Sequence, residues 1–206
     1  MPDFTRFMTK DEVLAVLADL HRRSELSRTS FCNLIIFRFA CCCGLRRKEV
    51  AGLIFTDLIL AGARPCIHIR KWNTKGRPGQ RHTRKVPLWW DAGTLADIKK
   101  WVEYRRQMGA TAEDPIICSL TKANFGKALT AKQIAKRWKT AIRCLGPERV
   151  RQLSVHCGRH TFASLSFDAG HSAVEVQEAL GHKSIHTTSI YLHGVPRDDV
   201  PDIFVA

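Results

Sequence analysis

The sequence predicts a mainly helical domain that carries one small antiparallel β-sheet, an α+β fold. Capping-box patterns at Thr9, Thr130 and Ser172 each open a stretch whose apolar residues recur at helical spacing. The clearest strand patterns occur in one region, where residues 66–70 and 84–88 flank a basic loop that contains glycine and proline. A chain of 206 residues can bury the core of one large domain, so the helices and the sheet are expected to share that core.

Three helices are predicted ahead of the sheet. The first begins at its capping box and continues through the apolar residues of 13–20. The second covers about residues 30–43, is mostly apolar and is therefore expected to be buried. Gly44 ends this helix, because glycine tolerates the left-handed conformation that follows many helices. The third helix is short and spans residues 46–53.

The second half is predicted to be helical apart from one extended stretch. Ile134, Trp138 and Ile142 lie on one face of the helix that opens at Thr130, and Gly181 closes the helix that opens at Ser172. In order, the sequence predicts a loop at 73–79, a helix over about 91–108, an extended stretch at 115–119, the helix from Thr130, a helix around 159–169, the helix from Ser172 and a last helix from Ser184 that carries Tyr191.

Positive charge dominates the composition. Lys and Arg total 33 against 19 Asp and Glu, which gives a formal net charge of +14 at pH 7. Residues 58–90 and 115–147 contain no acidic residue, although both stretches are rich in Lys and Arg. Such stretches favour contact with a polyanion, most commonly nucleic acid, and solvated basic faces are the alternative. An acidic membrane surface is a weaker candidate, because no basic amphipathic anchor is evident.

The eight cysteines have the pattern of neither a disulfide framework nor a zinc site. Residues 41–43 are three adjacent cysteines within an apolar run, and the other five are scattered without a C-x-x-C pair. A zinc site at His156 and His160 lacks a third ligand at a suitable spacing, so we expect no metal and no other cofactor. No signal peptide or membrane span is evident, and these features favour a reducing cytoplasm, at the nucleoid if DNA is the partner.

Two arginines occur in contexts that suit contact with a phosphodiester. Arg46 lies in Gly-Leu-Arg-x-x-Glu, and Arg159 lies in His-x-x-Arg-His. The guanidinium group is a planar fork that stays charged, which matches the negative charge that grows in the transition state of phosphoryl transfer. Leu-Gly-His182 follows, and Tyr191 comes nine residues later. The other tyrosine, Tyr104, is expected to be a half-buried aromatic residue whose hydroxyl is hydrogen-bonded.

These motifs, in this order, resemble the catalytic domain of tyrosine recombinases, the phage integrase family. The resemblance extends roughly from Thr9 to His193. It implies the fold of that domain and a site-specific enzyme that cleaves and rejoins DNA strands through a 3′-phosphotyrosine intermediate, without metal or ATP. It also implies double-stranded DNA as the partner and a homo-tetramer on DNA, and it leaves open a monomer when DNA is absent.

The resemblance assigns a role to each motif residue. Arg46 and Arg159 would hold the scissile phosphate, together with His156 and His182 as hydrogen-bond donors. Tyr191 would be the nucleophile, and its phenol must lose a proton as it attacks.

Further residues are predicted to support the reaction or to hold the DNA. Lys75, in the loop between the two strands, resembles the family's general acid for the leaving 5′ oxygen, although other cations of this loop compete for the role. Glu49 lies one turn after Arg46 and could orient its guanidinium group, and His160 is expected to be a supporting residue. The residues predicted to contact DNA elsewhere are Arg70, Lys71, Arg77, Arg81, Lys132 and Lys136.

The chain departs from the family pattern at its start. Members commonly carry a DNA-binding domain ahead of the catalytic one, whereas here the first catalytic helix opens at Thr9. We therefore expect residues 1–206 to form a single catalytic domain without that N-terminal domain: a truncated piece, a naturally short recombinase of the fimbrial-switch type, or a degenerate element. Without that domain the protein would hold the duplex from one side only, which should weaken DNA binding and raise its sensitivity to salt.

Other functions fit the same residues. An enzyme like the type IB topoisomerases would use this chemistry to relax DNA without strand exchange. A non-catalytic DNA-binding regulator would retain the fold alone, although the intact set of Arg, Lys, His and Tyr argues against it. A helical protein with accidental motifs is disfavoured by the order in which the motifs occur.

Overall fold

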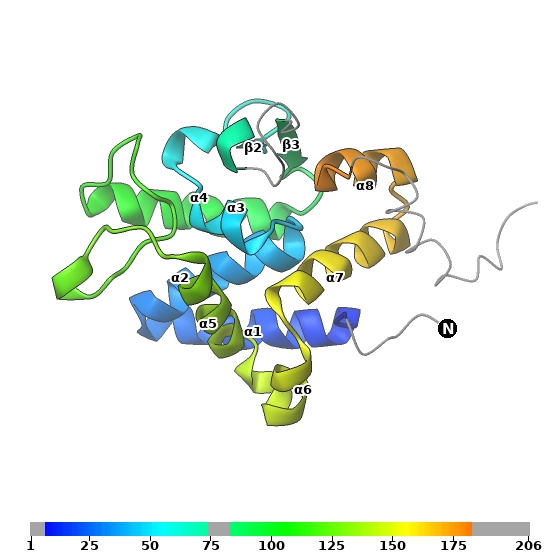
Figure 1. Ribbon diagram of the computed structural model, residues 1–206, viewed down its shortest axis with the longest axis horizontal. Coiled ribbons are helices and arrows are strands. Elements are labelled where there is room, and N and C mark those ends of the chain that lie inside the picture. The colour runs from blue at the N-terminus through cyan, green and yellow to red at the C-terminus, as the bar shows by residue number, and fades with distance from the viewer. Residues whose placement is uncertain (1–6, 74–82, 183–206) are drawn as a thin grey trace, which may run out of the picture.

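The computed structural model describes residues 7–73 and 83–182, in which a helical body carries a small sheet at one end (Figure 1). The α-helices are α1 (Lys10–Leu26), α2 (Arg28–Phe37), α3 (Arg47–Ala51), α4 (Ala92–Gln107), α5 (Ala131–Ala141), α6 (Gly146–Gln152), α7 (Val155–Asp168) and α8 (Ala173–Leu180). The strands are β1 (Leu58–Ile59), β2 (Cys66–Ile69) and β3 (Arg84–Pro87), and a π-helical turn, η2, covers Arg38–Cys42. The predicted α+β class is confirmed.

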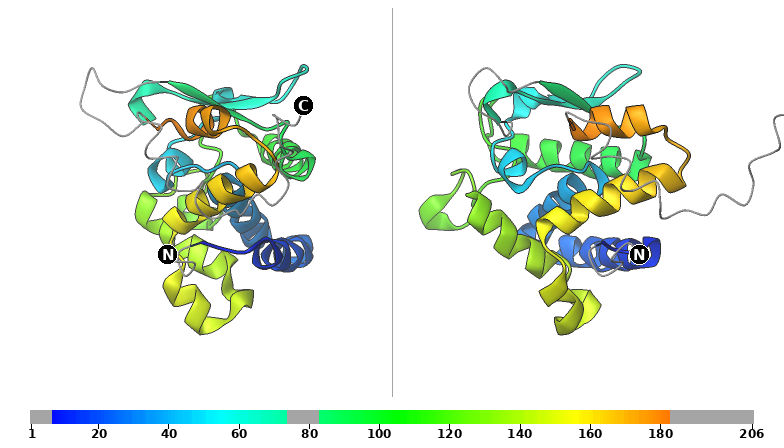
Figure 2. Two further views of the ribbon diagram at one scale, coloured as in Figure 1. Left: turned by 90° about the vertical axis from the view of Figure 1, so that its right-hand side faces the viewer. Right: turned by 45° about the vertical axis from the view of Figure 1, so that its right-hand side comes forward.

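The sheet is antiparallel, with the order β1-β2-β3 among the described residues. β2 pairs with β3 so that Cys66 lies opposite Pro87 and Ile69 lies opposite Arg84. This pairing confirms the two predicted strands, while β1 was not predicted because two residues are too few to form an alternating pattern. Figure 2 shows α8 lying between the sheet and α7, so the strand that begins at Arg84 runs beside the end of α8.

The core centres on α2, whose residues from Cys32 to Phe37 are all buried. α1, α4 and α5 pack around this helix, as expected for a helix that is apolar on every side. The Phe37 ring stacks on Trp138 of α5 at 5.5 Å between centroids, and the Trp138 indole donates to the carbonyl of Leu153. No helix in the described part of the chain has both the length and the apolar composition needed to cross a bilayer.

The predicted helix over 30–43 continues as far as expected, but its last turn is a π-helix. The buried Arg38 opens this turn, and its Nε donates to Asp97 at 2.8 Å while its Nη1 lies 3.2 Å from Asp91. Gly44 follows at φ 63°, and the amide of Leu45 donates back to the carbonyl of Phe39 at 2.9 Å. The chain therefore reverses sharply just before Arg46, as the sequence predicted for Gly44.

α7 begins four residues earlier than the sequence predicted, at Val155. His156 therefore lies in the first turn of this helix. The helix packs closely on η2 at Gly158, where an added Cβ would lie 2.8 Å from the Trp138 ring and 3.2 Å from the backbone of Ala40. This close approach places Arg159 directly beside the reversal at Gly44.

Candidate active site

Four basic residues from four separate segments gather at the end of the molecule that carries the sheet. Arg46 caps the start of α3, Arg84 begins β3, Arg159 lies in the first half of α7 and His182 follows α8. Three of these were predicted from motifs, and Arg84 was not.

Arg159 is the central residue of this cluster and is only 2% exposed. Its Nη1 donates to the carbonyl of Gly44 at 2.7 Å, and its Nη2 donates to the carbonyl of Leu180 at 2.5 Å. These two carbonyls belong to the Gly-Leu-Arg and Leu-Gly-His motifs. One guanidinium group thus holds Arg46 and His182 in the same neighbourhood, although they are far apart in the sequence.

Arg46 is oriented by Glu49, as the sequence predicted. The Arg46 Nη1 donates to Glu49 Oε1 at 3.0 Å, and the Arg46 amide donates to Oε2 at 2.8 Å. The carboxylate is buried, with 1% of the side chain exposed, whereas 27% of the Arg46 side chain reaches solvent. Arg46 is therefore fixed at its base while its guanidinium group remains accessible to a ligand.

Arg84 forms a fork-to-fork ion pair with the same carboxylate. Its Nη1 and Nη2 donate to Oε1 and Oε2 of Glu49 at 2.8 and 2.7 Å, and its Nε donates to the carbonyl of Ala179 at 2.8 Å. Burial alone would raise the pKa of the Glu49 carboxyl. The Arg84 and Arg46 guanidinium groups outweigh burial and hold this pKa below its usual value, so the carboxylate stays charged.

His182 lies next to the C-terminal end of α8, directly after Gly181. Gly181 ends α8, as the sequence predicted, and does so in the left-handed conformation, while the His182 amide donates to the carbonyl of Gln177. Burial and the positive charges of Arg159, Arg46 and Arg84, in that order, lower the pKa of His182 to about 4. The imidazole is therefore neutral at pH 7 and can donate one hydrogen bond without adding a charge.

His156 and His160 lie one turn apart on the same helix, with their ring centroids 4.5 Å apart. The predicted helical placement of His156, Arg159 and His160 is confirmed, but the three differ in exposure: His156 is exposed, His160 is intermediate and Arg159 is buried. No group of three or more potential metal ligands occurs within residues 7–73 and 83–182.

The other predicted residues differ in their exposure and contacts, and some lie outside the described part of the chain. Arg70 forms an ion pair with the buried Asp57 at 2.5 Å, which ties it to the fold, whereas Lys71 is exposed. Lys132 and Lys136 are exposed on one face of α5. Lys75, Arg77, Arg81 and Tyr191 lie outside the described residues.

The expectation for Tyr104 was partly wrong. Its ring is half-buried against Phe31 and Trp101, as expected. Its buried hydroxyl, however, has no hydrogen-bond partner among the described residues. The helical face that Tyr104 shares with Trp101 indicated the half-buried ring, but this pattern does not show whether the hydroxyl has a partner.

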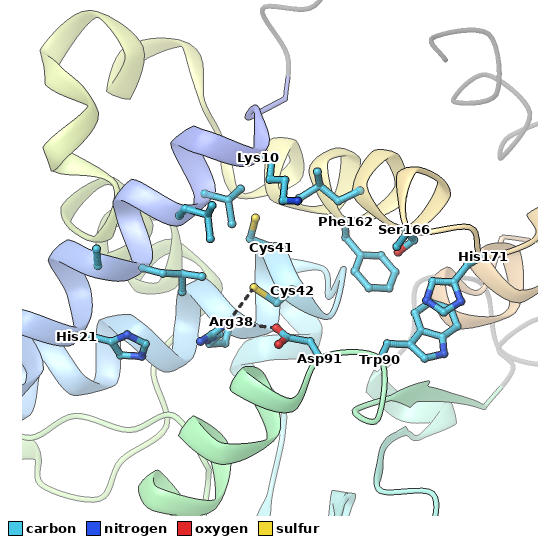
Figure 3. Close-up of a pocket in the computed structure, with 16 residues that line it drawn as sticks. Lys10, His21, Arg38, Cys41, Cys42, Trp90, Asp91, Phe162, Ser166 and His171 are labelled. Carbon is cyan, nitrogen blue, oxygen red and sulfur yellow. Dashed lines mark hydrogen bonds and ion pairs between the residues drawn. The ribbon is translucent and has the colours of Figure 1, made fainter. Parts of the chain in front are cut away.

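A cavity of about 570 Å³ lies elsewhere, between α1, η2, the start of α4 and α7 (Figure 3). Its walls are mostly apolar, and Trp90 stacks on His171 at one end with 3.8 Å between ring centroids. None of the predicted catalytic residues lines this cavity. Within the basic cluster, Arg46 and His182 are partly exposed, whereas the side chains of Arg84 and Arg159 are buried.

Comparisons with known proteins show what this chain is similar to. The family model for the phage integrase family matches residues 6–197. Tyrosine recombinase XerH of Helicobacter pylori is 33% identical over 186 residues, which are 90% of this chain and 48% of that protein. The chain thus spans about half the length of that relative.

Solved structures show the same fold. The XerA recombinase has a TM-score of 0.69 at 21% identity, with 91% of this chain and 58% of that chain covered. XerH bound to its palindromic difH substrate has a TM-score of 0.68 at 27% identity, with 91% of this chain and 49% of that chain covered.

Proposed function

This chain belongs to the phage integrase family, and from that premise we propose that it is a site-specific DNA recombinase that cleaves and rejoins strands through Tyr191. The basic cluster carries the proposal. Two arginines and a neutral histidine from separate segments are brought together by the contacts that Arg159 makes with Gly44 and Leu180. An arrangement of fixed cations suits a phosphodiester whose charge grows during the reaction.

In the proposed first step the Tyr191 phenol gives up its proton to solvent, and its oxygen forms a bond to the scissile phosphorus while the bond to the 5′ oxygen breaks. The leaving oxygen takes a proton, for which Lys75 is the proposed general acid. Arg46 and Arg159 offset the charge on the non-bridging oxygens, and His156 and His182 donate hydrogen bonds to them. The resulting 3′-phosphotyrosine is still a phosphodiester, in which an ester bond to Tyr191 replaces the one to the 5′ oxygen, so a 5′ hydroxyl can restore the strand without ATP or a metal ion.

Double-stranded DNA is the proposed partner. The related XerH has been solved with its difH DNA substrate, and the net charge of +14 favours the same class of ligand here. We propose that residues 1–206 act as one catalytic domain and that four copies assemble on two duplexes. Such an activity would place the protein at the nucleoid.

The test is to trap the covalent intermediate without assuming a target sequence. The protein is mixed with a nicked, sheared library of its host's DNA, and complexes that survive denaturation are recovered and their DNA ends are sequenced. We expect adducts at one recurrent sequence, joined at Tyr191, and no adducts with Tyr191→Phe.

Three results would contradict the proposal. Wild type that binds DNA specifically but forms no adduct would indicate a DNA-binding regulator. An adduct that persists in Tyr191→Phe would remove Tyr191 as the nucleophile. Relaxation of supercoiled plasmid with no recombinant product would indicate an enzyme like the type IB topoisomerases.

A further inference from the structure

Glu49 is a single buried carboxylate shared by two arginines. Its two oxygens accept four hydrogen bonds: two from Arg46, through the amide and Nη1, and two from the guanidinium group of Arg84. The side chains of Glu49 and Arg84 are only 1% and 7% exposed. A buried carboxylate is tolerated only when nearby positive charge compensates it, so the charges of this group must be considered together.

The net charge of these side chains determines how strongly the site attracts an anion. Arg46 and Glu49 alone form a neutral pair, and such a pair would attract a phosphate only weakly. With Arg84 the three groups carry one net positive charge, and Arg159 adds a second at the same site. His182 adds none at pH 7, because its pKa is about 4. The presence of Arg84 therefore decides whether the charge of Arg46 is available to a ligand.

Arg84 itself is poorly placed to bind that ligand. Its Nη1 and Nη2 are directed at Glu49, and its Nε donates to the carbonyl of Ala179 in the last turn of α8. Its Cδ lies so close to Gly181 that a Cβ there would approach within 2.7 Å. Arg84 thus joins three segments: the start of α3, the end of α8 before His182, and the strand that follows the loop carrying Lys75.

We propose that Arg84 is a positioning residue that neutralises Glu49, so that the positive charge of Arg46 acts on the scissile phosphate. This inference rests on the proposed function. It differs from a packing role because it makes charge, rather than shape alone, the property that matters at position 84.

The proposal is tested with three variants: Arg84→Lys, Arg84→Gln and the double variant Arg84→Gln/Glu49→Gln. The first readout is the binding of inorganic phosphate, followed through the NMR signals of His182, which needs no DNA cleavage. The second readout is the rate of adduct formation on DNA. Thermal unfolding of each variant establishes that it is folded.

Arg84→Gln leaves the buried carboxylate to neutralise Arg46, so we expect phosphate affinity and adduct rate each to fall roughly 10²-fold. In the double variant, which also lacks that carboxylate, phosphate affinity and adduct rate should each be about tenfold higher than in Arg84→Gln, although the double variant lacks more native contacts. Arg84→Lys keeps the charge and should remain within about tenfold of wild type. A purely structural role predicts the opposite order, with the double variant weakest.

A double variant no better than Arg84→Gln in phosphate binding would overturn the proposal. If Arg84→Gln does not fold, Arg84→Lys decides alone: loss of all phosphate binding in that folded variant would equally overturn it. The experiment distinguishes failure of the recombinase activity from failure of the charge role of Arg84. Wild type that binds phosphate with the expected order of variants, yet forms no adduct, refutes the recombinase activity and leaves the charge role of Arg84 supported.

Discussion

His182 is the residue whose chemistry depends most on its neighbours. Burial and three arginines lower its pKa to about 4 from the ordinary 6.5. We therefore expect its ring signals in an NMR titration of the free protein to change near pH 4. Inorganic phosphate should raise this pKa, because a bound anion offsets the repulsion between the arginines and the protonated ring.

The signals are assigned by comparison with His182→Asn, and the titration is repeated at high and low phosphate. An unshifted midpoint near 6.5 without phosphate would contradict the clustered geometry. The sign for stability also follows. Between pH 6.5 and 4 the unfolded chain binds more protons at this position, so the stabilisation that His182 provides above pH 6.5 is lost as the pH falls through this window.

At the residue scale, site residues could be predicted from the sequence where their contacts lie within one motif. Glu49 contacts Arg46 because it lies three positions after this N-cap residue, and such a contact can be predicted from spacing. Arg84 could not be recognised in this way, since its partner Glu49 is 35 residues away and several other cations lie nearby in the sequence. Only the fold shows which cation of the basic stretch belongs to the cluster.

At the scale of elements, the contact of α7 with η2 depends on the absence of a side chain at Gly158. A Cβ there would lie 2.8 Å from the Trp138 ring and 3.2 Å from the Ala40 backbone, and backbone cannot move aside cheaply. We expect Gly158→Ala to lower the free energy of unfolding by about 1–3 kcal/mol, as overpacking typically does. This loss should outweigh the roughly 1 kcal/mol that alanine gains over glycine in a helix.

Urea unfolding measures this prediction, with Gly93→Ala in α4 as the matched control. At Gly93 the added Cβ would lie 3.3 Å from the Arg38 and Asp91 side chains, which is farther than the 2.8 Å to the Trp138 ring at Gly158, and none of these closest contacts involves backbone. We expect the control to be near neutral. If Gly158→Ala proved as stable as Gly93→Ala, the close packing of α7 on η2 would be wrong, and with it the position of Arg159.

The helix starts that carry a capping box were predicted well, because this signal is local. The capping boxes at Thr9, Thr130 and Ser172 are all present, each with the side chain accepting from the third residue of its helix. The π-helical turn at η2 was not predicted, because Arg38 is buried by ion pairs with residues more than 50 positions away. α6 was also missed, since its short sequence has no buried face to create a pattern.

At the scale of the whole molecule, some of the Lys and Arg side chains make internal contacts that would compete with DNA. Several cations are used inside the protein: Arg149 pairs with Glu12 at 2.6 Å, and Lys139 donates to the carbonyls of Val150 and Arg151. Lys132 and Lys136, by contrast, are exposed one turn apart on α5, opposite the buried Ile134 and Trp138. The acid-free stretch predicted a DNA-binding surface, but only the structure separates its exposed lysines from those that hold the fold together.

The salt dependence of DNA binding tests whether Lys132 and Lys136 contact phosphates. Each phosphate contact contributes about 0.9 to the slope of log affinity against log salt, so Lys132→Gln/Lys136→Gln should reduce the magnitude of the slope by roughly 1.8. Lys99→Gln/Lys100→Gln removes the same charge from exposed positions on α4 and should leave the slope unchanged. Equal reductions in both double variants would mean that net charge, rather than the α5 surface, attracts the DNA. Because phosphate contacts carry no base information, the loss from the α5 variant should be similar for target and unrelated duplexes.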